Sequence, residues 1–194
     1  MSRGRFVVAV TGASGAAYAR RLLGLLADRA DEVHLVVSPY GMRLFADELD
    51  IRAQTVEAIL GRNAANVVMH NFNDVGSAMA SGSFLTGGMV VCPCSSNTLG
   101  AIASGLGDNL ITRAAHVHLK ERRPLILVTR EMPLSRIEIS NMLRITESGG
   151  IICPAAPGFY LRPKSIDDLV DFVAGKVLDL LGVTHELKTR WVQP

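Results

Sequence analysis

A guanidinium and a carboxyl group are adjacent at Arg130-Glu131, just after the short apolar run Leu125–Val128. Such a pair can bind a phosphate through the arginine and supply a proton from the glutamate. Three further basic residues, Arg113, His116 and Lys120, are spaced i, i+3, i+7 and share one face of a predicted helix. That face is either a solvated basic stripe, the commoner case, or an anion-binding wall, and the Arg130-Glu131 pair favours the wall.

A glycine-rich segment, Thr11-Gly-Ala-Ser-Gly15, follows the first apolar run. Its glycines let the backbone approach a ligand, and a helix that begins there offers free N–H groups to an anion or a flavin edge. The segment is not a full G-x-G-x-x-G, and Ser38 rather than an acidic residue follows the second apolar run. A mononucleotide such as FMN therefore fits better than a dinucleotide, although such turns also occur without ligands.

Hydrogen-bonding side chains also follow the third and fifth apolar runs. The third run leads into Pro93-Cys-Ser-Ser-Asn-Thr98, whose side chains suit either phosphate binding or helix capping. The fifth leads into Pro154-Ala-Ala-Pro-Gly-Phe-Tyr160, which presents a phenol. Tyr160 either contacts a ligand or packs as an amphipathic side chain.

The elements that must position these residues are predicted from hydrophobic periodicity. Five short apolar runs are typical of buried parallel strands: Phe6–Val10, Val33–Val37, Met89–Cys92, Leu125–Val128 and Gly150–Cys153. Helical spacing follows the first run, recurs over 137–145, and begins again after Ser165 with a capping arrangement. The alternation predicts an α/β fold, a three-layer αβα sandwich with a parallel sheet that binds ligands at the carboxyl ends of its strands. Residues 54–88 are the most weakly patterned part of the chain, and Gly76–Gly88 within them, rich in Gly, Ser and Ala, is predicted as a loop over a site or a poorly patterned connection.

Composition limits the class of protein. The chain has 194 residues, 48% of them hydrophobic, and a net charge of +2, which is too balanced for binding nucleic acid by bulk charge. We predict one domain over residues 1–194. The apolar runs fall far short of the ~20 residues of a membrane helix. Three cysteines are typical of a reducing cytoplasm.

Several apparent metal motifs are interpreted structurally. Asp167-Asp-Leu-Val-Asp171 matches a magnesium-diphosphate pattern, but it occurs at the start of an amphipathic helix, where acidic residues are favoured anyway. Cys92 and Cys94 lack the second pair that a zinc site needs. His116 and His118 point to different faces of the predicted helix, and His34, His70 and His185 have no partner visible in the sequence. We predict no metal site.

In combination, these motifs resemble the UbiX-type flavin prenyltransferases of the flavin-containing cysteine decarboxylase superfamily. The resemblance covers nearly the whole chain. Its most specific segments are Ala80-Ser-Gly-Ser-Phe84, Leu119-Lys-Glu-Arg-Arg-Pro124, Arg130-Glu-Met-Pro133 and Pro154–Tyr160. It implies a flavodoxin-like/Rossmann-like fold and a homo-oligomer, either a trimer or a dodecamer built from trimers. Sites at subunit interfaces would explain a basic helix that has no partner within its own chain.

The resemblance also implies roles for individual residues. The implied FMN contacts are Gly12, Ala13, Ser14, Ser38, Ser95, Ser96, Asn97, Thr98 and Arg130. The implied dimethylallyl phosphate contacts are Arg113, Lys120, Arg130, Glu131, Tyr160 and Lys176, where Lys176 replaces a common arginine. Ser14 and Glu48 match positions that handle protons, and Glu131 would assist the leaving phosphate.

The implied reaction joins a dimethylallyl group to N5 and C6 of reduced FMN, without a metal, for use by a UbiD-type decarboxylase. Because Asn97 makes its segment similar to that of the cysteine decarboxylases, an FMN-dependent decarboxylase of a cysteine-containing substrate remains an alternative. A non-catalytic FMN-binding subunit of an aromatic-acid decarboxylase is another.

Overall fold

The computed structural model describes residues 4–190, and its strands form one fully parallel sheet in the order β3-β2-β1-β4-β5-β6. The strands of this part of the chain are β1 Arg5–Val10, β2 Glu32–Val37, β3 Val67–His70, β4 Gly88–Cys94, β5 Leu125–Thr129 and β6 Ile151–Ile152. All five predicted strands are confirmed. Residues 1–3 and 191–194 of the predicted domain lie outside the described range.

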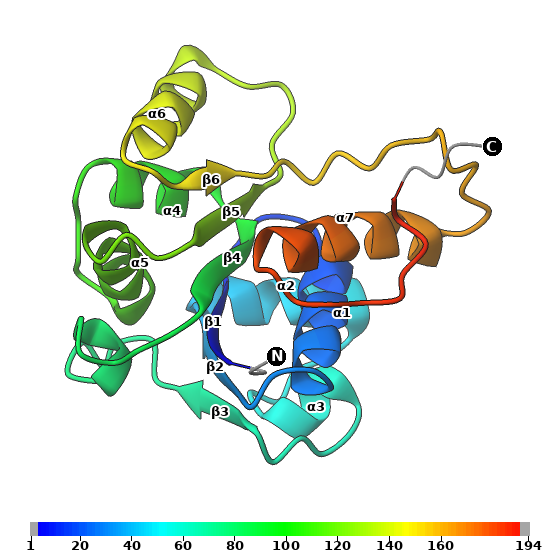
Figure 1. Cartoon of the computed structure of the whole chain (residues 1–194), viewed down its shortest axis with the longest axis horizontal. Coiled ribbons are helices and arrows are strands. Elements are labelled where there is room, and N and C mark those ends of the chain that lie inside the picture. Colours follow the sequence, from blue (N-terminus) through cyan, green and yellow to red (C-terminus); the bar gives the residue numbers. More distant parts are fainter. Residues whose placement is uncertain (1–3, 191–194) are drawn as a thin grey trace.

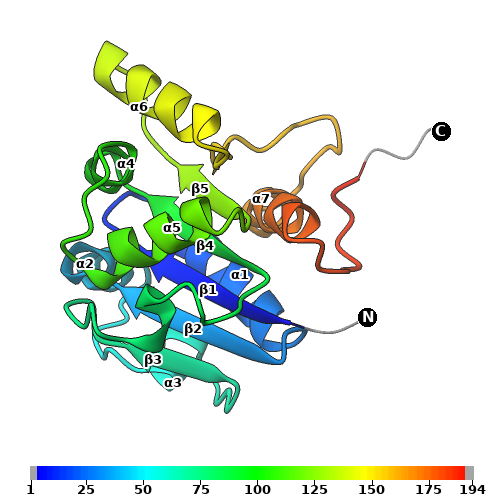
Figure 2. The same ribbon diagram turned by 60° about the vertical axis from the view of Figure 1, so that its left-hand side comes forward.

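Helices cover both faces of the sheet (Figures 1 and 2). On one side, α1 packs against α2, α3 and α7; on the other, α4 packs against α5 and α6. The bounds are α1 Ala16–Ala27, α2 Pro39–Leu49, α3 Val56–Leu60, α4 Ser96–Ala103, α5 Leu110–Lys120, α6 Arg136–Glu147 and α7 Ile166–Leu180, with a 3-10 turn, η1, at Ala78–Ala80. The predicted three-layer αβα sandwich is therefore confirmed.

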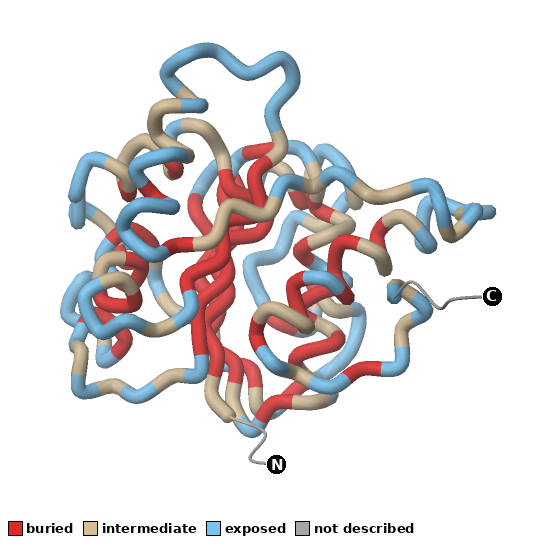
Figure 3. Tube along the Cα trace, turned by 45° about the horizontal axis from the view of Figure 1, so that its top comes forward, coloured by how far each residue is buried: buried red, intermediate tan, exposed pale blue. Residues whose placement is uncertain are grey.

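Each face of the sheet has its own apolar core, and the strands between them are buried (Figure 3). Along β1, Val8 and Val10 belong to the core beneath α1 and α7, whereas Val7 and Ala9 belong to the core beneath α4 and α5. Because side chains alternate across a strand and both faces are covered, the strand sequence is continuously apolar. This is why the central strands were recognisable from sequence.

The weakly patterned residues 54–88 contain α3 and β3. Thr55 caps α3 by accepting a hydrogen bond from the Ala58 amide at 3.2 Å. The four-residue β3 lies at the edge of the sheet, and only Val67 in it is buried. A short, half-solvated edge strand carries little hydrophobic signal, which is why neither of these two elements was predicted.

The start of α7 confirms the structural interpretation of its acidic residues. Ser165 and Asp168 form a reciprocal capping box, with amide-to-oxygen distances of 3.2 and 3.0 Å. Asp171 forms an ion pair with Arg21 at 2.5 Å. Within residues 4–190, no group of three or more His, Cys, Asp or Glu side chains is placed to hold a metal ion. No helix in that range has the length and apolarity required to cross a bilayer.

Candidate active site

Thr11 joins the carboxyl ends of the two central strands. Its hydroxyl donates to the Pro93 carbonyl at 2.9 Å and accepts from the Ser95 amide at 2.8 Å. These bonds fix the glycine-rich segment after β1 beside the polar segment after β4. Parallel pairing of β1 and β4 thus places two predicted ligand-binding segments at one edge of the sheet.

A cavity of about 720 Å³ opens at this edge, within the usual range of about 300–1,000 Å³ for ligand sites. Five of the residues predicted to contact FMN line it: Gly12, Ser38, Ser95, Asn97 and Thr98. The lining also includes residues that the sequence analysis missed, among them Tyr40, Phe72, Asn73, Asp108, Asn109 and Thr112. These arrive from α2, α5 and the 71–73 loop, which are distant in sequence and showed no shared motif.

Three helices begin at this cavity. The Ser38 hydroxyl accepts from the Gly41 amide at 3.0 Å, and the Ser95 hydroxyl from the Thr98 amide at 3.3 Å. The Asn109 side chain accepts from the Thr112 amide at 3.1 Å. The positive ends of α2, α4 and α5 therefore converge on one cavity, an arrangement that favours an anion. Ser38 and Ser95 are both helix caps, which confirms the capping interpretation of the segment that contains Ser95.

The cavity fits FMN in shape as well as in charge. A Cβ atom at Gly12 would lie 2.5 Å from the Cβ atom of Tyr40, so only glycine is tolerated at this wall. Backbone without a side chain next to an exposed aromatic ring, with helix N-termini nearby, suits a flat ring that carries a phosphate. FMN bound here would supply an electron-rich ring, to which the resemblance implies that a dimethylallyl group is joined.

Hydrogen bonds join the predicted catalytic and cofactor residues around Glu131. The Ser96 hydroxyl donates to Glu131 Oε2 at 3.0 Å. Arg130 Nε donates to the Ser14 carbonyl at 3.3 Å, which ties the end of β5 to the glycine-rich segment. Ala13 is buried in that segment, while Ser14 and Glu131 are exposed to solvent. A carboxyl, a guanidinium, the Ser96 hydroxyl and the Ser14 carbonyl therefore meet beside the cavity.

Glu48 reaches the same place from the far end of α2. Its carboxylate accepts hydrogen bonds from the amides of Gly15, at 3.1 Å, and Ala16, at 2.8 Å. Helix α1 has no capping side chain of its own, so this carboxylate caps it from another helix. Glu48 thereby lies next to Ser14, as expected for two residues predicted to act together. We refer to Ser14, Glu48, Ser96, Arg130 and Glu131 as the strand-end group.

Tyr160 and Lys176 lie along α7. The Tyr160 ring packs edge-on against Phe172, with ring centroids 5.7 Å apart, and Lys176 lies one turn further on. Burial raises the pKa of the Cys153 thiol, and the Lys176 ammonium partly opposes the shift, which places Lys176 near Cys153. The Ala155 amide donates to the Thr129 carbonyl at 2.8 Å, so the segment leading to Tyr160 starts beside Arg130.

Lys120 and Arg113 lie elsewhere. Lys120 ends α5, and the chain then enters β5, so Lys120 lies near the amino end of β5 and Arg130 follows its carboxyl end. Five strand residues separate these ends by about 16 Å. One copy of the chain therefore does not bring Lys120 to Arg130.

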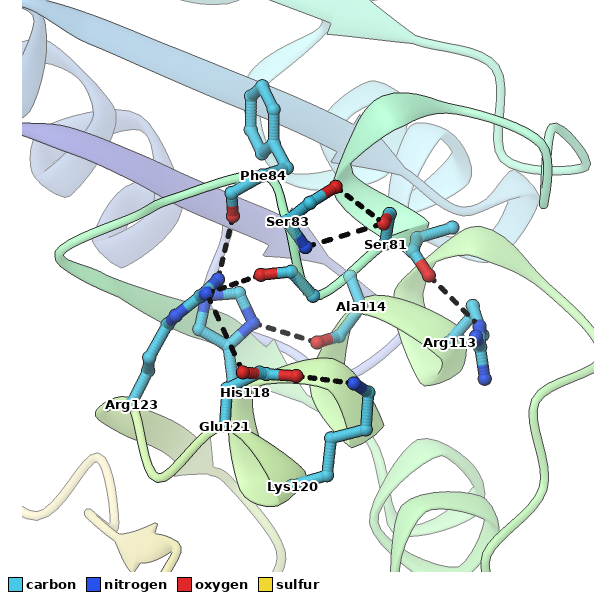
Figure 4. Close-up of polar contacts among 11 residues, drawn as sticks. Ser81, Ser83, Phe84, Arg113, Ala114, His118, Lys120, Glu121 and Arg123 are labelled. Atoms are coloured by element: carbon cyan, nitrogen blue, oxygen red, sulfur yellow. Dashed lines mark hydrogen bonds and ion pairs between the residues drawn. The ribbon is translucent and has the colours of Figure 1, made fainter.

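The expected absence of partners for the basic helix is also wrong. Lys120 forms an ion pair with Glu121, and Arg113 Nε donates to the Ala80 carbonyl at 3.2 Å. Figure 4 shows both contacts beside the segment that carries Ser81, Ser83 and Phe84. His34 and His70 have each other as partners, with 2.8 Å between His34 Nδ1 and His70 Nε2. The adjacency of β2 and β3 creates that contact, and the sequence carries no signal for it.

Comparisons with known proteins show which family this chain belongs to. The flavoprotein family model matches residues 1–178. The flavin prenyltransferase UbiX of Halalkalibacterium halodurans is 44% identical over 193 residues, covering 97% of this chain and 94% of that protein. The structure of AnUbiX (PadA1) in complex with FMN and dimethylallyl pyrophosphate has a TM-score of 0.86 and 42% identity over 97% of both chains.

A second solved structure, the dodecameric FMN-dependent Ubix-like decarboxylase from Escherichia coli O157:H7, has a TM-score of 0.89. It is 40% identical, and the match covers 97% of this chain and all of that one, 100%. Both structures share the parallel three-layer fold on which the cavity is built. The chain therefore belongs to the flavoprotein family and, within it, to the UbiX-type flavin prenyltransferases.

Proposed function

We propose that this protein transfers the dimethylallyl group of dimethylallyl phosphate to N5 and C6 of reduced FMN. The observation that carries the proposal is the meeting of Ser14, Arg130 and Glu131 beside the cavity where three helix N-termini converge. Near-complete coverage by relatives named flavin prenyltransferase supports it.

The strand-end group suits ionisation of an allylic phosphate ester. Arg130 would hold the departing phosphate, and Glu131, held by Ser96, would deliver a proton to it. Glu48, fixed beside Ser14, would accept the proton released when the ring closes. The Tyr160 hydroxyl, from the segment that starts beside Arg130, and the Lys176 ammonium, from α7, would contribute further donors.

We further propose that the protein works as a homo-oligomer in which a neighbouring copy supplies Lys120 and Arg113. The opposite placement of Lys120 and Arg130 at the ends of β5 supports this. The outer face of α6 and the loop before it also expose apolar side chains, with Met132 88%, Ile137 71% and Leu143 57% exposed. The Ubix-like decarboxylase from Escherichia coli O157:H7, which has the same fold, is dodecameric.

The remaining parts of the proposal concern context. We propose a single domain over residues 1–194, which the continuous sheet and its two flanking cores support. Three free cysteines, Cys92, Cys94 and Cys153, support a cytoplasmic location. The product would pass to a UbiD-type decarboxylase.

Mass spectrometry tests the reaction directly. Purified protein incubated anaerobically with reduced FMN and dimethylallyl phosphate should yield a flavin heavier by one C5H8 unit. Unchanged FMN, under conditions in which an established flavin prenyltransferase reacts, contradicts the proposal. Release of CO2 from a cysteine-containing substrate would instead support the decarboxylase alternative. Flavin binding without either reaction would support a non-catalytic subunit.

A further inference from the structure

We propose that Arg123 is a positioning residue for the substrate phosphate, because it fixes the backbone segment and the carboxylate that together hold Lys120 in place. The inference rests on the proposed function and assigns a role to Arg123 and Glu121, neither of which belongs to the strand-end group. Figure 4 shows the contacts that carry it.

Arg123 binds two carbonyl groups of an otherwise irregular segment. Its Nη1 donates to the Phe84 carbonyl at 2.6 Å, and its Nη2 donates to the Gly82 carbonyl at 2.5 Å. Only 13% of the Arg123 side chain is exposed. A planar guanidinium with two fixed donors sets both the position and the orientation of the backbone between these residues, which a lysine cannot do.

Glu121 connects Arg123 to Lys120. Its Oε2 lies 4.0 Å from Arg123 Nη2, and its Oε1 accepts from Lys120 Nζ. The Lys120 side chain is 53% exposed, so N–H groups that Glu121 does not use remain open to a ligand. The Arg123 charge thus stabilises a carboxylate whose function is to hold the lysine.

Gly82 shows how closely the segment approaches this ion pair. A Cβ atom at Gly82 would lie 2.2 Å from Glu121 Oε1 and 2.8 Å from Lys120 Nζ. The backbone of the segment therefore packs directly on the Lys120–Glu121 pair. Any side chain at this position would displace the two charged groups.

Two more contacts fasten the same segment along α5. Arg113 Nε donates to the Ala80 carbonyl, and the neutral His118 ring donates from Nδ1 to Ala114 and accepts from the Thr86 hydroxyl at 2.8 Å. The exposed Ser81 and Ser83 hydroxyls, 2.9 Å apart, are left on the outer side. We call this set, which comprises residues 80–86 with Arg113, His118, Lys120, Glu121 and Arg123, the α5 clamp.

The α5 clamp presents ammonium and hydroxyl donors in a fixed geometry, which is what a phosphate monoester requires. Loss of Arg123 would free the Gly82–Phe84 backbone and leave Glu121 held only by Lys120. The lysine would then be drawn toward Glu121 and away from the ligand. Substrate binding should weaken, whereas FMN, which binds at the far end of α5, should be unaffected.

The test compares Arg123→Gln with Arg122→Gln in the assembled, FMN-loaded protein. Both variants lose one positive charge, but within residues 4–190 the Arg122 side chain makes no hydrogen bond or ion pair. Calorimetric titration of the oxidised holoprotein with dimethylallyl phosphate gives the dissociation constant without turnover, and steady-state assays give KM and kcat separately. Flavin fluorescence gives the FMN affinity.

We expect Arg123→Gln to raise the dissociation constant and KM for dimethylallyl phosphate about tenfold, with kcat within about threefold and FMN affinity unchanged. Arg123→Lys should lie between it and the wild type, and Arg122→Gln should match the wild type. Equal binding by Arg123→Gln and the wild type overturns the inference. Joint loss of FMN and substrate binding also overturns it, because that result indicates a merely structural role.

If Arg123→Gln does not fold, the variant Gly82→Ala tests whether the α5 clamp positions Lys120. It leaves Arg123 intact and inserts one methyl group into the Lys120–Glu121 pair, so it should weaken dimethylallyl phosphate binding in the same way. Gly76→Ala is the matched control, because its new Cβ would meet only Asp74 Oδ1 at 3.4 Å. Wild-type substrate affinity in Gly82→Ala refutes the role of the clamp. A wild-type protein that neither binds nor prenylates would refute the proposed function itself.

Discussion

The strand-end group and the α5 clamp lie at opposite ends of β5 and are built differently. The strand-end group consists of residues that directly follow parallel strands or cap the helices after them. The α5 clamp consists of side chains from one helix and its exit that grip the carbonyls of an irregular segment. Topology places the first group, whereas individual side-chain bonds place the second.

This difference has a functional consequence. A group placed by the sheet keeps its geometry when one side chain is changed, so substitutions there should affect chemistry more than binding. A group placed by side-chain bonds loses its geometry with them, so substitutions there should affect binding more than chemistry. In the proposed homo-oligomer, a second copy of the chain would bring the two groups to one substrate.

The largest effect should come from Glu131→Gln in the strand-end group. The variant keeps the hydrogen bond from Ser96 but lacks the carboxyl group that we propose protonates the leaving phosphate, so the prenylation rate should fall by about 10²-fold or more. FMN affinity should stay at the wild-type value. Tyr160→Phe should slow the reaction by a smaller factor. Wild-type turnover by both variants would contradict the assigned roles.

Complementation between copies tests whether the two groups meet across an interface. Lys120→Met and Glu131→Gln should each be nearly inactive alone. If the site combines Lys120 of one copy with Glu131 of another, co-expressed hybrids should regain roughly a quarter of the wild-type activity by random assembly. Mixing the separately purified oligomers without subunit exchange is the control. Hybrids as inactive as the parent variants would place both residues in one copy.

A stability effect should follow from Glu48→Ala. Removing the carboxylate leaves the Gly15 and Ala16 amides without their acceptor and should cost about 1 kcal/mol of unfolding free energy, measured by urea denaturation. Asp47→Asn is the control, because its exposed side chain forms an ion pair with Arg43 at 3.4 Å on the same helix and makes no other ion pair among residues 4–190. Equal stability of the Glu48 variant and the control would show that α1 does not depend on this cap.

The last prediction concerns pH and the α5 clamp. Burial lowers the pKa of His118 below the ordinary value of about 6.5, so the folded protein keeps this ring neutral while the unfolded chain takes up a proton. Its contribution to stability is therefore present above pH 6.5 and is lost as the pH falls below that value. Protonation also removes the acceptor for the Thr86 hydroxyl.

Urea denaturation at pH 7.5 and 5.0 measures this contribution. His118→Gln should lose less stability on acidification than the wild type, by up to about 1.4 kcal/mol per pH unit for one proton. His34 and His70, whose pKa values burial also lowers, titrate in both proteins and cancel in the difference. Identical pH profiles would show that His118 does not titrate differently on folding.

Much of the strand-end group was predictable from sequence because the parallel α/β pattern places strand-following residues at one edge. Once the central strands were recognised, Ser14, Ser96 and Arg130 were expected to lie at the same edge of the sheet. Side chains that reach the edge from elsewhere, such as Tyr40, Asn109 and Thr112, had no such signal. The residue pattern also carried no signal for the hydrogen bond between Glu48 and the amide of Ala16, which lie 32 residues apart.

The sequence by itself determined the order of the central strands and helices along the chain, because periodic burial of apolar side chains leaves a local pattern. It also determined which polar residues follow the strands. Only the tertiary structure decided that Lys120 and Arg130 lie at opposite ends of β5, and that Arg123 holds the backbone of Gly82. These relations depend on how an irregular segment packs against a helix. Every residue has the same backbone carbonyl group, so the sequence carries no signal for which carbonyl accepts such a hydrogen bond.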